Sequence, residues 1–295
     1  MARTVADAVR DSATRLDAAG VSFGHGTLDS TQESMWLAAH ALGLDWAALT
    51  AAMGKPIPME AEKALAALVA KRIATRKPAA YLLNEAWLGT HRFYVDERVI
   101  VPRSFIFELI EGRKLGGARS ILDLCTGSGC LAILAALRWP KARVDAADIS
   151  PQALEVARRN VDDYGLGERV RLVRSDMFAA LAGRAYDLIV SNPPYVNAAS
   201  MKKLPEEYRR EPALALASGA DGLDHARVIL AETRDHLNPG GRLVVEIGHN
   251  RKTLERAFPA LPFEWPKTSG GRNFVFTLPR EALPAREVQQ TERRP

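Results

Sequence analysis

The first eighty residues carry apolar positions at helical spacing. Val5, Val9 and Leu16 fall on one helical face, because residues four and seven apart lie on the same side of a helix. Ser30 and Glu33 match the capping-box pattern, in which a serine begins a helix and a glutamate three residues later bonds back to it. The opening of the chain therefore predicts two amphipathic helices.

A third short helix is predicted after Asp45. A fourth carries Leu65, Leu68 and Val69 at spacings of three and four, and Pro78 closes that pattern. We interpret residues 1–80 as an N-terminal helical domain, which by itself indicates packing or recognition of a partner.

Tryptophans and charges within this domain have simple structural explanations. Trp36 and Trp46 lie on apolar helix faces and are predicted to pack in the core. A basic cluster is predicted to be a solvated helix face: Lys71, Arg72, Arg76 and Lys77. Three acids further along the chain are predicted to be solvated charges beside a substrate cleft: Glu206, Glu207 and Glu211.

The periodicity changes between residues 81 and 102. Aromatic and β-branched residues surround a glycine in Trp87-Leu88-Gly89 and Phe93-Tyr94-Val95, which predicts a β-hairpin. Val99-Ile100-Val101 is a further extended run, and Pro102 closes it. We interpret residues 81–102 as a hairpin connector.

Strand-like and helix-like segments alternate from residue 103 to residue 279. This rhythm predicts an α/β fold of the Rossmann-like type, with a mostly parallel sheet and helices on both faces. The predicted strands are 120–124, 142–147, 170–173, 186–190, 242–247 and 274–278, and the predicted helices begin at Leu131 and Pro151. The polar segment 280–295 is predicted to be a disordered tail.

Composition indicates where the protein works and what it binds. The chain has 295 residues, of which 47% are hydrophobic and 25% charged, and its net charge of +5 permits contact with an acidic partner without requiring it. No apolar run is long enough to span a bilayer and no signal peptide begins the chain, so we expect a cytoplasmic protein with no membrane contact. The two cysteines and six scattered histidines lack metal-ligand spacing, so no metal is predicted.

Acidic and small residues follow three successive predicted strands. The first strand ends in Asp123 and a glycine-rich turn made of Cys125, Thr126, Gly127, Ser128 and Gly129. The second ends in Asp148, where a carboxylate can accept from ribose hydroxyls, and the third is followed by Asp176 and Met177, which suit an adenine amine and ring. No lysine follows the glycines, which disfavours a P-loop. The order predicts a nucleoside-bearing cofactor.

The fourth strand runs into Asn192-Pro193-Pro194-Tyr195. Prolines fix the backbone and donate no N–H, so carbonyl oxygens and the Asn192 side-chain oxygen form a rigid set of acceptors beside the flat Tyr195 ring. Such a set suits a planar –NH2 group on an sp² carbon, whose two hydrogens need acceptors. We predict the reaction site here.

At these residues the chain resembles class I methyltransferases, and specifically the HemK/Prm family of protein N5-glutamine methyltransferases. The resemblance extends to residues 93–104, to Leu216-Ala217-Ser218-Gly219-Ala220-Asp221-Gly222-Leu223-Asp224 and to Glu246-Ile247-Gly248. Cys125 and Ser104 look like the PrmB branch, whose substrate is ribosomal protein uL3, although Phe105 departs from the proline expected there.

The resemblance implies S-adenosylmethionine as the cofactor and residue roles at matching positions. Asp123 and the glycine turn would hold its methionine part, Asp148 with Ile149 its ribose side, Asp176 with Met177 its adenine, and Phe93 would cover it. Catalysis would fall to Asn192, Pro193 and Tyr195, and substrate binding to these residues with Pro194. The helical domain would help recognise the protein substrate.

The implied partner is uL3, either free or on a ribosome precursor, and direct contact with nucleic acid is allowed but not required. Three alternatives stay open at this point. The first is the same reaction on peptide chain release factors. The second is methylation of an adenine amine in nucleic acid, since that nitrogen is also conjugated. The third is a non-enzymatic assembly factor that keeps the cofactor fold.

Overall fold

A computed structural model describes residues 2–112 and 114–285. The chain divides into two compact units. The first takes in the chain up to Arg103 together with Lys203–Pro212, and the second takes in Ser104–Lys202 and the chain from Ala213 onward. The chain therefore leaves the second unit after the fourth central strand, passes through the first, and returns.

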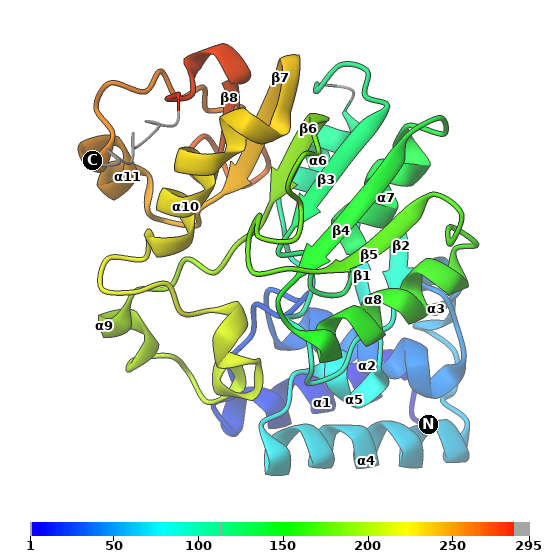
Figure 1. The fold of residues 1–295 in the computed structure, drawn as a ribbon. Coiled ribbons are helices and arrows are strands. Elements are labelled where there is room, and N and C mark those ends of the chain that lie inside the picture. Colours follow the sequence, from blue (N-terminus) through cyan, green and yellow to red (C-terminus); the bar gives the residue numbers. More distant parts are fainter. Residues whose placement is uncertain (1, 113, 286–295) are drawn as a thin grey trace, which may run out of the picture. The chain divides into compact units, whose positions relative to one another are not determined.

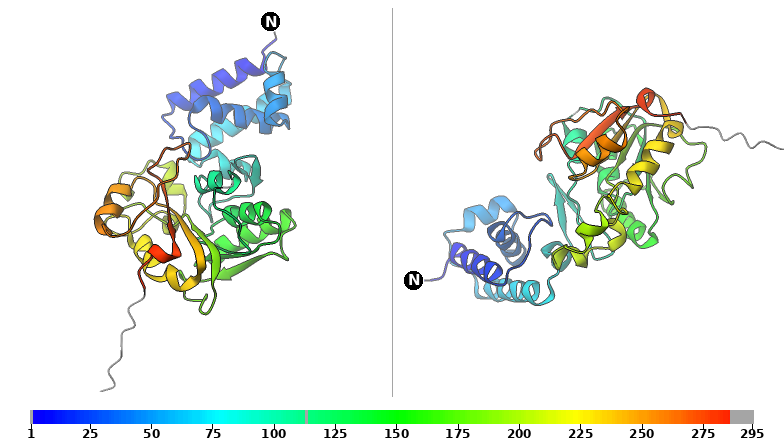
Figure 2. Two further views of the ribbon diagram at one scale, coloured as in Figure 1. Left: turned by 90° about the horizontal axis from the view of Figure 1, so that it is seen from above. Right: turned by 90° about the vertical axis from the view of Figure 1, so that its left-hand side faces the viewer.

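The predicted helices of the first unit are confirmed. Val5, Val9 and Leu16 are all buried along one face of the first helix. The helices drawn blue to cyan in Figure 2 pack side by side around that face. The elements are α1 (Val5–Ala18), α2 (Ser30–Leu42), α3 (Trp46–Ala52), α4 (Met59–Thr75), α5 (Ala79–Leu83), β1 (Ala86–Leu88), β2 (His91–Phe93) and η1 (Glu207–Arg210).

The hairpin prediction is also confirmed, because β1 pairs antiparallel with β2. The predicted capping box at Ser30 and Glu33 is wrong. Asp29 is the N-cap of α2 and accepts from the backbone N–H of Gln32, while Glu33 points inward to a buried arginine. The predicted core position of Trp46 is wrong as well, since its side chain is 52% exposed, whereas Trp36 is buried.

The charged clusters are buried in part, contrary to prediction. Arg72 is fully buried on α4 and donates to Glu33 (Nε–Oε1 2.8 Å), to Glu207 (Nη1–Oε1 3.3 Å) and to the Ser22 carbonyl. Helical spacing shows which residues share a face, but it does not reveal that acids distant in sequence will neutralise a charge there.

Glu211 is the second buried acid of this returning segment. It accepts from Arg103 (Nη2–Oε2 2.7 Å) and from the Val101 N–H (3.0 Å), and His25 lies 3.6 Å away. Burial by itself would raise the pKa of Glu211, but Arg103 overcomes that effect and holds the pKa at about 2. Residues 203–212 are thus anchored in the first unit by ion pairs.

The second unit is built on a six-stranded sheet, as predicted. Its order is β5-β4-β3-β6-β7-β8, with β8 antiparallel to β7 and the other neighbours parallel. The strands are β3 (Ser120–Leu124), β4 (Arg143–Asp148), β5 (Val170–Arg174), β6 (Tyr186–Ser191), β7 (Leu237–Glu246) and β8 (Val275–Pro279). Figure 1 shows them fanning across this unit.

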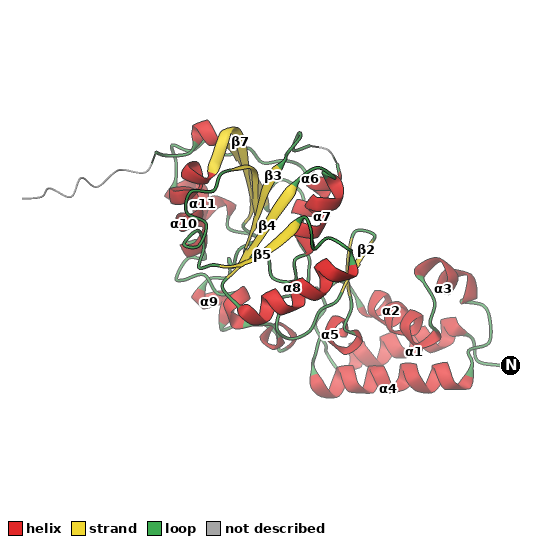
Figure 3. Ribbon diagram, turned by 45° about the vertical axis from the view of Figure 1, so that its right-hand side comes forward, coloured by secondary structure: helices red, strands yellow, loops and turns green. Residues whose placement is uncertain are grey.

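Helices cover both faces of this sheet. Figure 3 shows α6 and α7 on one face and α10 and α11 on the other. The helices are α6 (Ile106–Glu111), α7 (Cys130–Arg138), α8 (Pro151–Asp163), α9 (Ala198–Met201), α10 (Asp224–Glu232) and α11 (Arg251–Ala257), with short 3-10 turns η2 (Ala213–Ala215), η3 (Thr233–His236) and η4 (Arg280–Ala282).

The order of the strands changes direction at β3, which comes first in the sequence among the strands of this sheet but lies inside it. Its neighbours are β4 on one side and β6 on the other, and Leu124 lies directly across from Ser191. Ligands of open α/β sheets bind at the carboxyl ends of strands where the order reverses. The topology therefore places the glycine turn and the Asn-Pro-Pro-Tyr segment at one such point.

The predicted tail begins too early. Residues 280–282 form η4, and the apolar side chain of Leu283 is 1% exposed within the core cluster of the second unit. The remainder of the predicted tail, 286–295, lies outside the described residues. In the part of the chain that is described, no helix is both long and apolar enough to cross a membrane.

Candidate active site

Asp123 is buried one residue before the end of β3. Its Oδ2 atom accepts from Thr126 Oγ1 (2.5 Å) and from the Ala132 N–H (3.0 Å), whereas its buried Oδ1 atom has no hydrogen-bond partner among the described residues. Burial raises the pKa of Asp123 to about 7, and the charge of Asp148 adds to that effect. A buried carboxylate with a free oxygen favours a proton or a positively charged ligand.

The turn after β3 needs left-handed backbone at three positions. Cys125, Gly127 and Gly129 have φ values of +62°, +55° and +80°. A Cβ on Gly129 would lie 3.2 Å from the Cβ of Ala157, so this glycine also lets α7 and α8 approach. Cys125 adopts the same region with a side chain, which strains the backbone.

Both cysteines are free thiols. Burial raises the pKa of both thiols, in Cys130 to about 12. Both therefore stay neutral at physiological pH and are not nucleophiles.

Asp148 connects the second strand to the glycine turn. Its Oδ2 atom accepts from the Gly127 N–H and its Oδ1 atom from the Ser150 N–H, both at 2.9 Å. The next residue, Ile149, is 44% exposed, which is unusual for a large apolar side chain at a strand end. Burial raises the pKa of Asp148. An apolar surface thus adjoins a carboxylate at this edge.

The third strand adds a further acid to the same edge. The Ser175 N–H donates to the Asp148 carbonyl (3.0 Å), and Ser175 Oγ donates to the Met177 carbonyl (2.7 Å). Met177 has a φ of +45°, and Asp176 between them is exposed. The structure therefore brings together the three acids that the sequence placed at successive strand ends.

Asn192 follows β6 beside the glycine turn. Ser191 Oγ donates to the Leu124 carbonyl (2.7 Å), which joins this segment to the end of β3. The Oδ1 atom of Asn192 is buried and has no hydrogen-bond partner within residues 2–112 and 114–285. A buried acceptor without a hydrogen bond destabilises the fold by about 1–3 kcal/mol. A donor from outside the chain that bonds to Asn192 Oδ1 would therefore bind favourably.

Tyr195 is held by residues that sequence reasoning did not assign to the site. Asn250 Nδ2 donates to the Tyr195 carbonyl (2.7 Å), and the Tyr195 ring packs so closely on Gly248 that a Cβ there would lie 2.6 Å from its Cε2 atom. A Cβ on Gly222 would lie 2.5 Å from the Tyr195 carbonyl oxygen. Gly222 and Gly248 lie in two of the stretches that carry the family resemblance, 216–224 and 246–248. That resemblance was the sequence signal that could have assigned them to the site.

Ser104 and Phe105 also acquire physical roles. Glu246 Oε2 accepts from Ser104 Oγ (2.7 Å) and from the Phe105 N–H (2.8 Å). The Phe105 ring packs against Phe274 with centroids 5.1 Å apart. The serine hydroxyl thus links the start of the second unit to the end of β7.

Phe93 lies in the first unit. It is 1% exposed in β2, where it pairs with Ala86. Its expected contact with the cofactor stays a prediction. In the described ranges 2–112 and 114–285, no three histidine, cysteine, aspartate or glutamate side chains gather closely enough to hold a metal ion.

Two known domain families match the sequence of this chain, one in its N-terminal part and one in its sheet-bearing part. Residues 105–220 match the Methyltransferase small domain, and residues 7–83 match the PrmC N-terminal domain. The hMettl16 catalytic domain, solved in complex with the MAT2A 3'UTR hairpin 1, has a similar fold with a TM-score of 0.50 and 17% sequence identity. That match covers 75% of this chain and 79% of that one.

The sheet order, the acids at its switch point and the matching domain define an S-adenosylmethionine-dependent methyltransferase of class I. The ribosomal protein uL3 glutamine methyltransferase of Neisseria meningitidis serogroup B is 52% identical, over 95% of this chain and 94% of its own. The proteins of that name from Burkholderia pseudomallei and Bordetella pertussis are 47% and 49% identical, with about the same coverage. The chain belongs to the family of uL3 glutamine methyltransferases. This confirms the resemblance to the PrmB branch of the HemK/Prm family.

Proposed function

We propose that this protein transfers a methyl group from S-adenosylmethionine to the side-chain amide nitrogen of a glutamine in ribosomal protein uL3. The observation that carries the proposal is the buried, unpartnered Oδ1 atom of Asn192 beside the glycine turn. The relatives at about half identity bear the name of this activity and span nearly the whole chain, which supports uL3 as the substrate.

The cofactor fits the residues present. S-adenosylmethionine carries positive charge on its ammonium and sulfonium groups, and when bound it supplies an electrophilic methyl group. The edge of the sheet offers an unpartnered oxygen on Asp123 and two further carboxylates. The residues that we propose to hold it are Phe93, Asp123, Cys125, Thr126, Gly127, Ser128, Gly129, Asp148, Ile149, Asp176, Met177 and Asn192.

The reaction site acts mainly by positioning. The amide nitrogen of glutamine is a poor nucleophile because its lone pair is delocalised. Asn192 Oδ1 and the Pro193 carbonyl accept its two hydrogens, Pro194 stiffens the segment, and the Tyr195 ring packs on the amide plane. These oxygens also stabilise the positive charge that develops on nitrogen. The product nitrogen then loses a proton to water, so no side-chain base is required.

The remaining parts have supporting roles in this proposal. Residues 1–80 recognise the protein substrate, 81–102 connect the domains, and 103–279 form the catalytic domain. The protein works in the cytoplasm, because the substrate named for its relatives is a ribosomal protein. That substrate is methylated either free or on a ribosome precursor.

The test is methyl transfer from labelled cofactor to purified uL3, followed by mass spectrometry of its glutamines. Asn192→Ala should abolish transfer, because it removes the acceptor, while the cofactor dissociation constant changes by no more than several-fold. Loss of transfer and of cofactor binding in equal measure would remove Asn192 from the amide site.

Two parallel substrates separate the alternatives. Purified release factor and an adenine-containing RNA should gain no label under conditions in which uL3 is fully modified. Labelling of release factor in preference to uL3 would reassign the substrate within the same reaction. Labelling of RNA alone would overturn the protein-glutamine proposal.

A further inference from the structure

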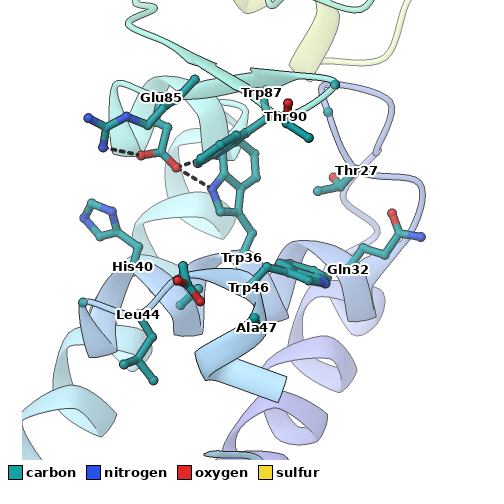
Figure 4. Close-up of a pocket in the computed structure, with 16 residues that line it drawn as sticks. Thr27, Gln32, Trp36, His40, Leu44, Trp46, Ala47, Glu85, Trp87 and Thr90 are labelled. Atoms are coloured by element: carbon teal, nitrogen blue, oxygen red, sulfur yellow. Dashed lines mark hydrogen bonds and ion pairs between the residues drawn. The ribbon is translucent and has the colours of Figure 1, made fainter. Parts of the chain in front are cut away.

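A cavity of about 1080 Å³ opens within the first unit, between α2, the start of α3 and the β1–β2 hairpin. Three tryptophans line it: Trp36, Trp46 and Trp87. Figure 4 shows Trp36 and Trp87 meeting at Glu85, with Trp46 lying toward Gln32. Trp46 and Trp87 are 52% and 47% exposed, so large apolar rings face solvent where a partner could cover them.

One carboxylate fixes two of these rings. Glu85 Oε1 accepts from the indole N–H of Trp36 (3.0 Å) and from that of Trp87 (2.8 Å), while Arg92 lies 3.5 Å from Oε2. With both N–H groups already bonded, these indoles offer their faces rather than their polar edges. The wall is therefore ordered before any ligand arrives, which lowers the entropic cost of binding.

The charge of the lining selects the ligand. Asp45 is exposed at the cavity, and one of its oxygens caps α3 through the Ala48 N–H (Oδ1, 2.7 Å). Glu85 is already paired with Arg92, which also lines the cavity, so the negative charge of the lining rests mainly on Asp45. A carboxylate beside aromatic faces attracts Arg and Lys side chains through ionic and cation–π contacts. The charge of Asp45 repels phosphate, which disfavours a nucleic acid here.

The size of the cavity points to more than one side chain. Its volume lies at the upper end of the range of about 300–1,000 Å³ that small-molecule sites occupy, which leaves room for several side chains of a peptide segment. We propose that this tryptophan cavity binds a segment of the protein substrate that bears arginine or lysine, at a distance along the substrate from the methylated glutamine. The inference rests on the proposed function and adds a second contact to it.

The first test separates recognition from chemistry. Trp46→Ala and Trp87→Ala should each raise the KM for uL3 about tenfold, since buried tryptophan anchors commonly carry more than 1 kcal/mol of binding. Both kcat and the dissociation constant of S-adenosylmethionine should stay unchanged. Met59→Ala removes an apolar side chain of the same unit that is 65% exposed and does not line the cavity, and should leave KM as it was.

The second test isolates the charge. Asp45→Asn keeps a side chain that caps a helix equally well but removes the negative charge. It should raise the KM for uL3 about threefold and flatten the dependence of KM on salt. An unchanged KM and salt slope would overturn the cationic assignment.

The outcomes distinguish the two proposals. If the unaltered protein does not methylate uL3, the proposed function fails. If it does, but the two tryptophan variants match Met59→Ala in KM, the cavity is not a substrate site and the function stands. Quenching of tryptophan fluorescence by an adenine-containing RNA, but not by uL3, would also overturn the inference.

Discussion

Gly248→Ala tests whether the Tyr195 ring must lie where it does. Gly248 has a φ of +54°, and a Cβ there would lie 2.6 Å from Cε2 and 2.8 Å from Cδ2 of Tyr195. An ordinary contact is 3.4–4 Å, so the ring edge must retreat by about 1 Å. Displacement of this size at a positioning group can cost about a hundredfold in rate.

The substitution has a second effect that must be separated from the first. An alanine in left-handed backbone destabilises the fold by about 1–2 kcal/mol. Gly165→Ala shares that strain, because Gly165 has a φ of +63°, but nothing lies within 4 Å of its added Cβ. Both variants should lose similar stability in thermal denaturation, whereas only Gly248→Ala moves the ring.

The assay compares kcat/KM for uL3 methylation in the two variants. We expect Gly248→Ala to be about tenfold to a hundredfold slower than Gly165→Ala, with the same affinity for S-adenosylmethionine. In a Tyr195→Ala background the added substitution should have little further effect, because the clash is gone. Equal activity of the two glycine variants would refute the idea that the ring position matters.

Two further predictions concern the glycine turn. Burial raises the pKa of Asp123 from 3.8 to about 7, so its contribution to stability is complete below pH 4 and is lost as the pH rises to 7. A bound cation favours the ionised form, so affinity for S-adenosylmethionine should rise from pH 6 to pH 8 with release of a proton. Titration calorimetry measures both, and a pH slope that persists in Asp123→Asn would contradict this assignment. Cys125→Gly should stabilise the protein by about 1 kcal/mol by relieving its φ of +62°. A lower melting temperature would show that Cys125 side-chain packing outweighs the strain.

Much of this molecule was predictable because local signals and global topology agree. β6 and β7 carry short apolar runs, 188–190 and 243–245, and parallel sheets place their ligands at the carboxyl ends of strands, so Asp123, Asp148 and Asn192 could be located from the sequence. Residue order along the chain was enough, since neighbouring strand ends converge at one edge.

The failures share a different cause. Glu33 resembled a helix cap and Arg72 a solvated charge, yet each is the other's buried partner across thirty-nine positions of sequence. Trp46 resembled a core residue, but it faces a cavity that forms only when the hairpin is in place. Sequence periodicity reports which face a residue occupies and not what lies opposite that face.

The ten residues from Lys203 to Pro212 give the architecture a consequence for engineering. Because the chain visits the first unit twice, removing residues up to and including Arg103 is not a clean domain deletion. Such a truncation would leave Glu207 and Glu211 without their partners Arg72 and Arg103. Both acids would then lie on a loop that follows α9, downstream of Tyr195. A minimal catalytic fragment would have to shorten that loop as well, joining α9 to η2.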